Sequence, residues 1–274
     1  MLSLWIFGFA VAVVLALARL RWELDVRSLR ARLSKGRERV PQPPYDPEEI
    51  RDLPAPVRRF FEAALVPGCP FIGGAALAHE GSIRLGPSFQ AGFVSSTMVI
   101  VRRPGFLWEA RLRIPLGLLV HDAYAQGEGS LDVGAAAGFV RLQRVRRRTG
   151  LPEGQLLRYL AEAPWYPTAL LPRAGVRWDA DGETSARATL VDGLTTASLL
   201  FVFADDGLVE RVRAEARGRE VRGKLVPQPW EGRFAAPRAR GPYTVPHEAT
   251  VAWIDPNGES APYWTGRLVD ARYD

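Results

Sequence analysis

The pattern of hydrophobic and polar residues separates an unbroken apolar run at the start of the chain from a long region of alternation. Residues 1–18 contain no charged side chain. A helix of eighteen to twenty residues is roughly 27–30 Å long, about the thickness of one hydrocarbon core. Trp5 and Trp22 lie near the two ends of the run, where amphipathic rings favour the membrane interface. We therefore predict a transmembrane helix over residues 1–20.

Two other interpretations of this segment stay open. Ala16-Leu17-Ala18 resembles the small-residue pattern of a signal-peptide cleavage site, although no basic side chain precedes the apolar run. The third interpretation is a buried core helix. Residues 19–39 hold eight basic and three acidic side chains, and basic residues beside a span tend to stay cytoplasmic. We therefore expect a single-pass anchor in a bacterial cytoplasmic membrane, with the rest of the chain on the cytoplasmic side.

Residues 21–52 are predicted to form a basic amphipathic helix followed by a proline-rich linker. Leu20, Leu24, Leu29 and Leu33 fall roughly on one helical face, with arginines around them. The basic flank over residues 19–39 can lie on an anionic leaflet, or it can form a solvated stalk. Four prolines between residues 40 and 47 stiffen the linker, because they fix φ and remove hydrogen-bond donors.

After a helix predicted over residues 55–66, apolar and polar residues alternate with a period of two, which is typical of half-buried strands. The predicted strands cover residues 76–85, 91–102, 106–115, 118–126, 175–181, 184–191, 195–203, 208–217, 248–255 and 262–272. Four dipeptides favour tight turns between consecutive antiparallel strands. They are Asp181-Gly182, Asp192-Gly193, Asp206-Gly207 and Asn257-Gly258.

The region 135–172 has a different pattern and is predicted to be largely helical. Leu156, Leu160 and Ala163 fall on one face of a helix over 154–163. Pro164 interrupts this helix, and Pro167 suits the first position of a second short helix that Pro172 ends. A broken helix between two sets of antiparallel strands is expected to lie across a curved sheet.

These elements predict an α+β fold in which residues 53–274 form a single β-rich domain after the transmembrane helix. We expect a large curved antiparallel sheet, or an open barrel, with helices on its concave face. This outline is similar to the half-barrels of lipoprotein-carrier and lipid-binding proteins. Such a sheet with helices across it can enclose an apolar cavity.

The net charge changes the interpretation of the high isoelectric point. The chain carries a formal charge of +6, of which the 19–39 segment contributes +5. The rest is therefore close to neutral and lacks the basic excess of a nucleic-acid binder, so we expect no nucleic-acid partner. A local exception is the cluster Arg141, Arg144, Arg146, Arg147 and Arg148, which is either a solvated face or a site for phosphate or lipid headgroups.

Several segments together resemble an uncharacterised bacterial family of unknown function whose members carry an N-terminal hydrophobic segment. They are LPAPVRRFF (53–61), PGFLWEARL (104–112), LLRYLAEAPWYPTALLP (156–172), SARATLVDG (185–193), PWEGRF (229–234) and PYWTGRLVDARYD (262–274). The resemblance covers nearly all of the chain after residue 50. It implies neither a known activity nor catalytic residues.

The sequence contains no local motif for catalysis or for a cofactor. Its three histidines, His79, His121 and His247, form no metal-ligand spacing, and its one cysteine, Cys69, allows no intramolecular disulfide. We predict no metal and no cofactor. His121 and Asp122 are neighbours on a strand, so their side chains are expected to point to opposite faces.

The candidate ligand-binding residues lie around the predicted helix and on two aromatic segments. They are Arg158, Tyr159, Glu162, Trp165, Tyr166, Trp230 and Trp264. Arg158 and Glu162 are spaced to form an ordinary helix ion pair, and the aromatic residues suit either a core or a cavity wall. The leading hypothesis is a membrane-anchored, non-enzymatic binding module for a lipid or other hydrophobic ligand. The alternatives are a membrane-associated interaction or structural protein, and a hydrolase that uses Glu162, Asp122 or His121.

Overall fold

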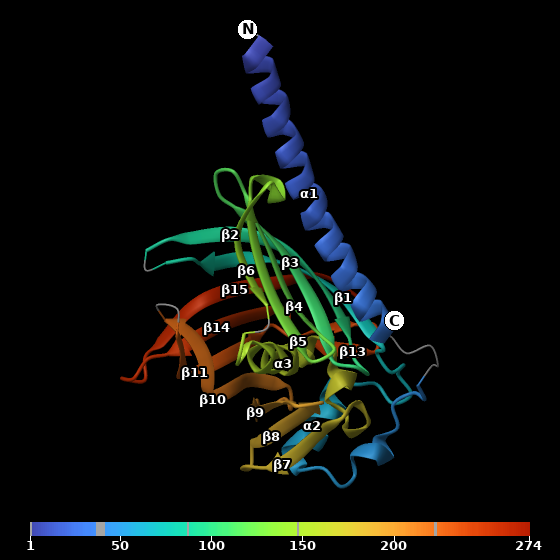
Figure 1. The fold of residues 1–274 in the computed structure, drawn as a ribbon. Helices are drawn as coiled ribbons and strands as arrows, with labels where there is room; N and C mark the ends of the chain where they lie inside the picture. The colour runs from blue at the N-terminus through green and yellow to red at the C-terminus, as the bar shows by residue number, and fades with distance from the viewer. Residues whose placement is uncertain (1, 37–41, 87, 147, 222–223) are drawn as a thin grey trace.

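A computed structural model describes residues 2–36, 42–86, 88–146, 148–221 and 224–274 of the chain. Within these ranges thirteen strands form one curved antiparallel sheet, a half-barrel with helices on both faces (Figure 1). The strand order is β6-β5-β4-β3-β2-β1-β15-β14-β11-β10-β9-β8-β7. The predicted α+β class with a large curved antiparallel sheet is therefore confirmed.

The sheet consists of two meanders that join where the first strand pairs with the last. The first meander contains β1 Gly74–Arg84, β2 Gln90–Ile100, β3 Gly105–Arg113, β4 Leu118–Ala125, β5 Glu128–Ala135 and β6 Val140–Arg146. The second contains β7 Val176–Ala180, β8 Ser185–Asp192, β9 Thr195–Phe203, β10 Val209–Val221, β11 Lys224–Ala235, β14 Glu248–Ile254 and β15 Ser260–Tyr273. Gly81 of β1 meets β15 so closely that a Cβ there would lie 2.0 Å from the carbonyl oxygen of Thr265, so the seam requires glycine.

The four predicted dipeptide turns are confirmed. They connect β7 to β8, β8 to β9, β9 to β10 and β14 to β15, and all four strand pairs are antiparallel. Gly193, Gly207 and Gly258 have φ of 60°, 83° and 85°, which glycine adopts without the steric penalty of a side chain. A small separate hairpin of β12 Arg238–Arg240 and β13 Tyr243–Val245 lies between β11 and β14.

The prediction of a largely helical region over 135–172 is wrong in its first part. Residues 128–146 supply β5 and β6, joined by the 3-10 turn η2 Ala136–Gly138. The strand signal was weak because the residues of β5 on the face toward α1 are small or polar, namely Ser130, Asp132 and Gly134. With β11, these two strands make the sheet three strands wider than the sequence pattern indicates.

Strand β11 was not predicted because it contains Pro227 and Pro229, and proline is normally excluded from central strands. The pairing explains how these residues are tolerated. Pro227 pairs with Gly218 of β10 and Pro229 lies at the register shift of that strand pair, but the pairing of β11 with β14 begins only at Trp230. The prolines therefore lie in a stretch with one partner strand, where a missing N–H donor can face away from the ladder.

The helices that cover the concave face occupy the middle of the sequence. α3 Leu151–Glu162 lies inside the curve of the sheet (Figure 1), and three 3-10 turns follow it: η3 Ala163–Trp165, η4 Pro167–Leu170 and η5 Pro172–Ala174. α2 Ala55–Ala64 buries Val57, Phe60 and Phe61 against the second meander. The short turn η1 Pro47–Ile50 precedes α2 and begins with a capping box between Asp46 and Glu49.

The first helix, α1 Leu2–Gly36, is continuous across the predicted boundary at residue 20. The segment Trp5–Lys35 is long and apolar enough, by length and composition, to cross a membrane. Its most apolar stretch of 18 residues has a mean hydropathy of 1.7, and only 6% of that stretch is buried. Its first half projects beyond the sheet (Figure 1), unlike the buried core helix considered as an alternative. Part of the predicted proline-rich linker lies outside the described residues, as do Arg37 and Arg39 of the basic flank. In the described part of the linker, Tyr45 is buried in the core.

The second half of α1 packs on the sheet face opposite α3, which corrects the predicted amphipathic face. Trp22, Val26, Leu29 and Leu33 are buried there, whereas Leu20 and Leu24 are about half exposed. The four buried side chains form a second hydrophobic core with Ile100, Leu107, Ala123 and Ala125 of the sheet. Residues 19–36 are therefore docked on protein along one side rather than forming a fully solvated stalk or lying wholly on a leaflet.

Ion pairs fix the docked half of α1 and involve most of the arginine cluster on β6. Asp25 of α1 accepts hydrogen bonds from Arg141 and Arg144, at 2.6 and 3.4 Å, and buried Asp132 of β5 accepts one from Arg146 at 3.2 Å. On the other side, Arg30 pairs with Glu109 at 2.6 Å. Arg148 pairs with Glu220 at 2.5 Å, so three carboxylates partly neutralise the cluster. Arg147 lies outside the described residues.

Candidate functional site

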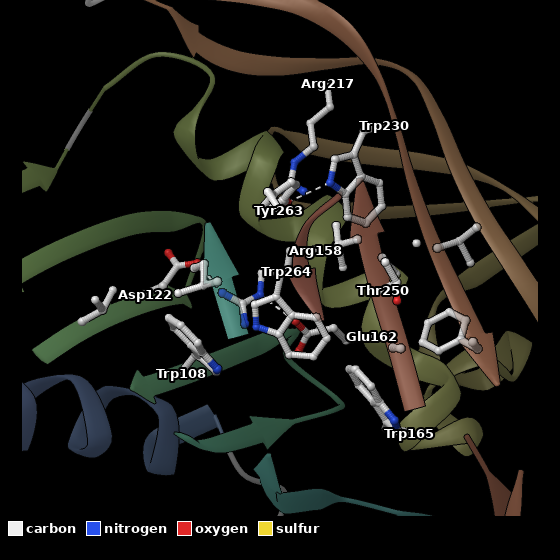
Figure 2. Close-up of a pocket in the computed structure, with 18 of the residues that line it drawn as sticks. Trp108, Asp122, Arg158, Glu162, Trp165, Arg217, Trp230, Thr250, Tyr263 and Trp264 are labelled. Carbon is white, nitrogen blue, oxygen red and sulfur yellow. Dashed lines mark hydrogen bonds and ion pairs between the residues drawn. The ribbon is translucent and has the colours of Figure 1, made fainter. Parts of the chain in front are cut away.

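A cavity of about 250 Å³ lies between α3 and the concave face of the sheet (Figure 2). Its aromatic lining consists of Trp108, Trp165, Trp230, Phe234, Tyr263 and Trp264. Its polar lining consists of Asp122, Arg158, Glu162, Arg217 and Thr250. The remaining lining residues are aliphatic or glycine. Strands of both meanders contribute to the walls, so the cavity exists only because the two half-sheets curve toward each other.

Arg158 of α3 is the central polar group of the cavity wall. Its Nη1 donates to Oδ2 of Asp122 and its Nε to Oε1 of Glu162, both at 2.6 Å. The guanidinium lies over the rings of Phe106 and Trp108, at 5.0 and 4.9 Å from their centroids. Burial alone would lower the pKa of Arg158, but the two carboxylates outweigh it and hold the pKa above its usual value. Arg158 therefore stays positively charged, and its charge is balanced by the two carboxylates that it holds against the cavity wall.

Gln155 extends this network one turn toward the start of α3. Its Nε2 donates to Asp122 and to the carbonyl oxygen of Ser130, at 3.0 Å for the latter. Asp122 thus receives donors from two residues of α3, and the helix is bound to β4 and β5 by polar contacts as well as by its apolar face. The network sets the distance between α3 and the sheet, and so the depth of the cavity.

A cluster of tilted and edge-on aromatic rings borders the cavity at β1 and contains a buried histidine. The ring of His79 lies 4.4 Å from that of Trp165 and 6.1 Å from that of Trp264. Burial, with a smaller contribution from the charge of Arg158, lowers the pKa of His79 to about 3. Among the described side chains, Nε2 of His79 has no hydrogen-bond partner. His79 is therefore neutral at physiological pH.

Arg217 lies on the opposite wall, against two tryptophans. Its guanidinium is 4.7 Å from the ring centroid of Trp230 and 5.9 Å from that of Trp253, and its Nη2 donates to the carbonyl oxygen of Gly154 at 3.3 Å. Trp230 in turn donates its indole N–H to the hydroxyl of Tyr263 at 2.9 Å. The stacking directs a cation toward a largely apolar space (Figure 2).

The structure brings five of the seven candidate residues to this cavity. Arg158, Glu162, Trp165, Trp230 and Trp264 line it. Tyr159 and Tyr166 do not. Both are fully buried in the core, where Tyr166 donates to the carbonyl oxygen of Tyr159 at 2.6 Å and Tyr159 donates to that of Val101 at 3.3 Å.

Arg217 was missed because strict alternation places it on the outer face of β10 with Arg211 and Arg213. The pairing of β10 with β11 shifts register between Ala214 and Arg217, and this bulge turns the following side chain inward. Trp108, Tyr263 and Asp122 also line the cavity. Trp108 and Asp122 lie on inward positions of β3 and β4 that the alternation could have identified.

The three groups considered as a hydrolytic set do not share one cleft. Asp122 and Glu162 both bind Arg158, whereas His121 points to the other face of the sheet, 4.5 Å from the ring of Trp22. The predicted divergence of His121 and Asp122 is confirmed. In the described part of the chain, no three histidine, cysteine or acidic side chains lie close enough together to hold a metal ion.

The fold and the cavity define the class of protein: an open antiparallel half-barrel that encloses a small, mainly apolar cavity under a helix. The profile of DUF6920, a family of unknown function, matches residues 51–273. The chain belongs to this family, which confirms the predicted resemblance to an uncharacterised family.

No curated protein matches the chain. A crystal structure of a LolA superfamily protein from Nitrosomonas europaea is similar at 10% sequence identity, with a TM-score of 0.41, over 80% of this chain and 92% of that protein.

Proposed function

We propose that this protein is a membrane-anchored, non-enzymatic binding module that holds a lipid or another hydrophobic ligand in the cavity beneath α3. The observation that carries the proposal is the cavity itself, because a chain of this size normally fills its interior to near-crystalline density. At about 30 Å³ per molecule, a space of about 250 Å³ equals about eight waters. Its lining is mostly aromatic and aliphatic, which suits an apolar occupant better than water.

The size and charges of the cavity support a small or single-chain ligand rather than a whole diacyl lipid. Ligand pockets range from about 300 to 1,000 Å³, so this one lies just below that range. Arg158 is neutralised by Asp122 and Glu162, whereas Arg217 uses one donor on a backbone carbonyl. A ligand with an apolar body and a polar end therefore fits, with its polar end toward Arg217.

Native mass spectrometry of the full-length protein, gently purified in detergent and followed by solvent extraction, tests the proposal. We expect a co-purifying apolar molecule. Val251→Trp, which places a large ring in the cavity wall, should abolish its retention, because the ring occupies the ligand's space. Val191→Trp is the matched control, since Val191 is 60% exposed on β8 and outside the cavity. A wild-type protein that binds no apolar probe under any condition, or equal retention by both variants, would refute the proposal.

A further inference from the structure

A second apolar surface lies at one end of the sheet and shares no residue with the lining of the ligand cavity. Four large hydrophobic side chains are exposed there: Leu116 at 81%, Phe139 at 37%, Val140 at 46% and Leu142 at 58%. We refer to these four residues as the tip patch. They come from the β3–β4 turn and from the η2–β6 segment, which are tied together by a hydrogen bond from the N–H of Ala136 to the carbonyl oxygen of Leu116, at 3.0 Å.

The backbone at the end of the patch is unusual for its sequence. Leu116 has φ of 65° and Gly117 has φ of 59°, a pair of left-handed residues that two-residue turns usually build from Asn-Gly or Asp-Gly. A leucine in this conformation is strained, because its Cβ crowds the backbone. Because its side chain is also almost fully exposed, burial within the chain does not offset that strain.

The tip patch lies at the level where the apolar run of α1 ends. A Cβ on Gly138 of η2 would lie 3.0 Å from Cγ of Trp22 and 3.2 Å from Nη1 of Arg19, so η2 is level with residues 19–22 of the helix. Beyond this level α1 continues away from the sheet with its side chains exposed, past the β3–β4 turn (Figure 1).

We propose that the tip patch inserts into the interfacial layer of the bilayer that α1 crosses, as a second membrane contact of the same protein. This inference rests on the proposed membrane anchoring. A bilayer threaded by residues 2–18 has its interface at Arg19–Trp22, and the patch is held beside that point by the docking of α1 on β3, β4 and β6. An exposed apolar tip beside the end of an apolar helix suits the interfacial layer, where headgroups adjoin acyl chains.

The test places an environment-sensitive fluorophore on single cysteines of the full-length Cys69→Ala protein. The protein is reconstituted at one copy per nanodisc of phosphatidylethanolamine and phosphatidylglycerol, with and without spin-labelled quencher lipids. Leu116→Cys reports on the patch and Phe9→Cys on the anchor. Leu194→Cys is the matched control, because Leu194 is a fully exposed leucine in the β8–β9 turn, at the other end of the molecule.

We expect the labels at positions 116 and 9 to shift to shorter wavelength and lose intensity to the quencher, while the label at 194 does neither. Quenching at 9 but not at 116 overturns the tip contact and leaves the anchor intact. Quenching at neither position overturns the anchor and the tip contact together, yet leaves the ligand cavity untested by this experiment and open to mass spectrometry. A label at 116 that is shielded only when several copies share one disc would show that a second copy covers the patch, and would also overturn the proposal.

Discussion

His79 shows how one buried side chain makes the stability of the protein depend on pH. Its ring packs against Trp165 and Trp264, and its pKa of about 3 lies far below the value of about 6.5 expected in the unfolded chain. Between these two values the unfolded state binds more protons than the folded state. The contribution of neutral His79 to the free energy of unfolding is therefore fully present above about pH 6.5 and is lost as the pH falls toward 3.

We predict that wild type loses about 2 kcal/mol more stability than His79→Phe when the pH is lowered from 7 to 5. Phenylalanine keeps the aromatic contacts but cannot bind a proton. Denaturant unfolding of the detergent-solubilised protein at several pH values measures the difference. His247→Phe is the control and should keep most of the wild-type slope, because His247 is only partly buried. Equal slopes in wild type and His79→Phe would contradict the assignment.

Individual positions were predictable where the spacing of residues fixes their direction. The helical interval between Arg158 and Glu162 places both on one face, and the structure shows them on the same cavity wall. The same periodicity cannot distinguish a cavity from a packed core, so Tyr159 and Tyr166 were assigned to a ligand but lie in the core. Arg217 faces inward only because of a backbone bulge, for which the sequence offers no clear signal.

At the scale of elements, the docking of α1 depends on one tryptophan that enters the sheet surface. Trp22 is 3% exposed and lies against His121 at 4.5 Å between ring centroids. A Cβ on Gly134 would lie 2.8 Å from Cζ3 of Trp22, so the helix sits in a depression that only glycine leaves open. Tertiary packing thus decides which face of the helix is buried. The spacing of the leucines alone predicted a face that also included Leu20 and Leu24, which are about half exposed.

We predict that Trp22→Ala loosens the docked half of α1 at a cost of about 3–5 kcal/mol, the usual range for emptying a buried aromatic site. Amide hydrogen exchange should accelerate in residues 22–36 and leave β8 and β9 unchanged. Leu24→Ala is the matched control on the same helix, where the side chain is 51% exposed, and should have little effect. Unaltered exchange in Trp22→Ala would mean that the ion pairs of Asp25 and Arg30 hold the helix alone.

Strands were recognisable where apolar and polar residues contrast, and invisible where they do not. The regular alternation of β8 and β9, with glycine turns between them, was sufficient to predict both strands. β5 presents small and polar residues, and β11 carries two prolines, so their pairing is imposed by neighbouring strands. A sheet of this width becomes apparent only when the partners of each strand are known.

For the whole molecule, the proposed insertion of α1 in a membrane leaves one choice, which is the side that the half-barrel occupies. The 19–39 segment has eight basic and three acidic residues, and residues 1–18 have none. We predict that residues 42–274 face the cytoplasm, since basic flanks are retained there. Proteinase added to intact spheroplasts should leave the half-barrel uncut and should digest it after lysis. Digestion in intact spheroplasts would place it on the outer side.

The curved sheet was predictable as an architecture because consecutive antiparallel strands with tight turns leave few other solutions. The docking of a continuous α1 on the face opposite α3 was not, because it depends on contacts between segments far apart in the sequence. The predicted architecture suggested that a cavity could form between the sheet and the helix. Its volume and lining follow from the polar network that spaces α3 from β4, which no local pattern specifies.

The seam between β1 and β15 has a consequence for biosynthesis. β1 ends at Arg84 and its partner β15 begins only at Ser260, so a nascent chain emerging from the ribosome exposes an open β1 edge until nearly the whole sequence has been translated. Unpaired edges of this kind recruit other strands and promote aggregation. The proposed anchor, if inserted early, would keep neighbouring nascent chains dispersed along the bilayer during that interval, and the first residues would then assist folding as well as set location.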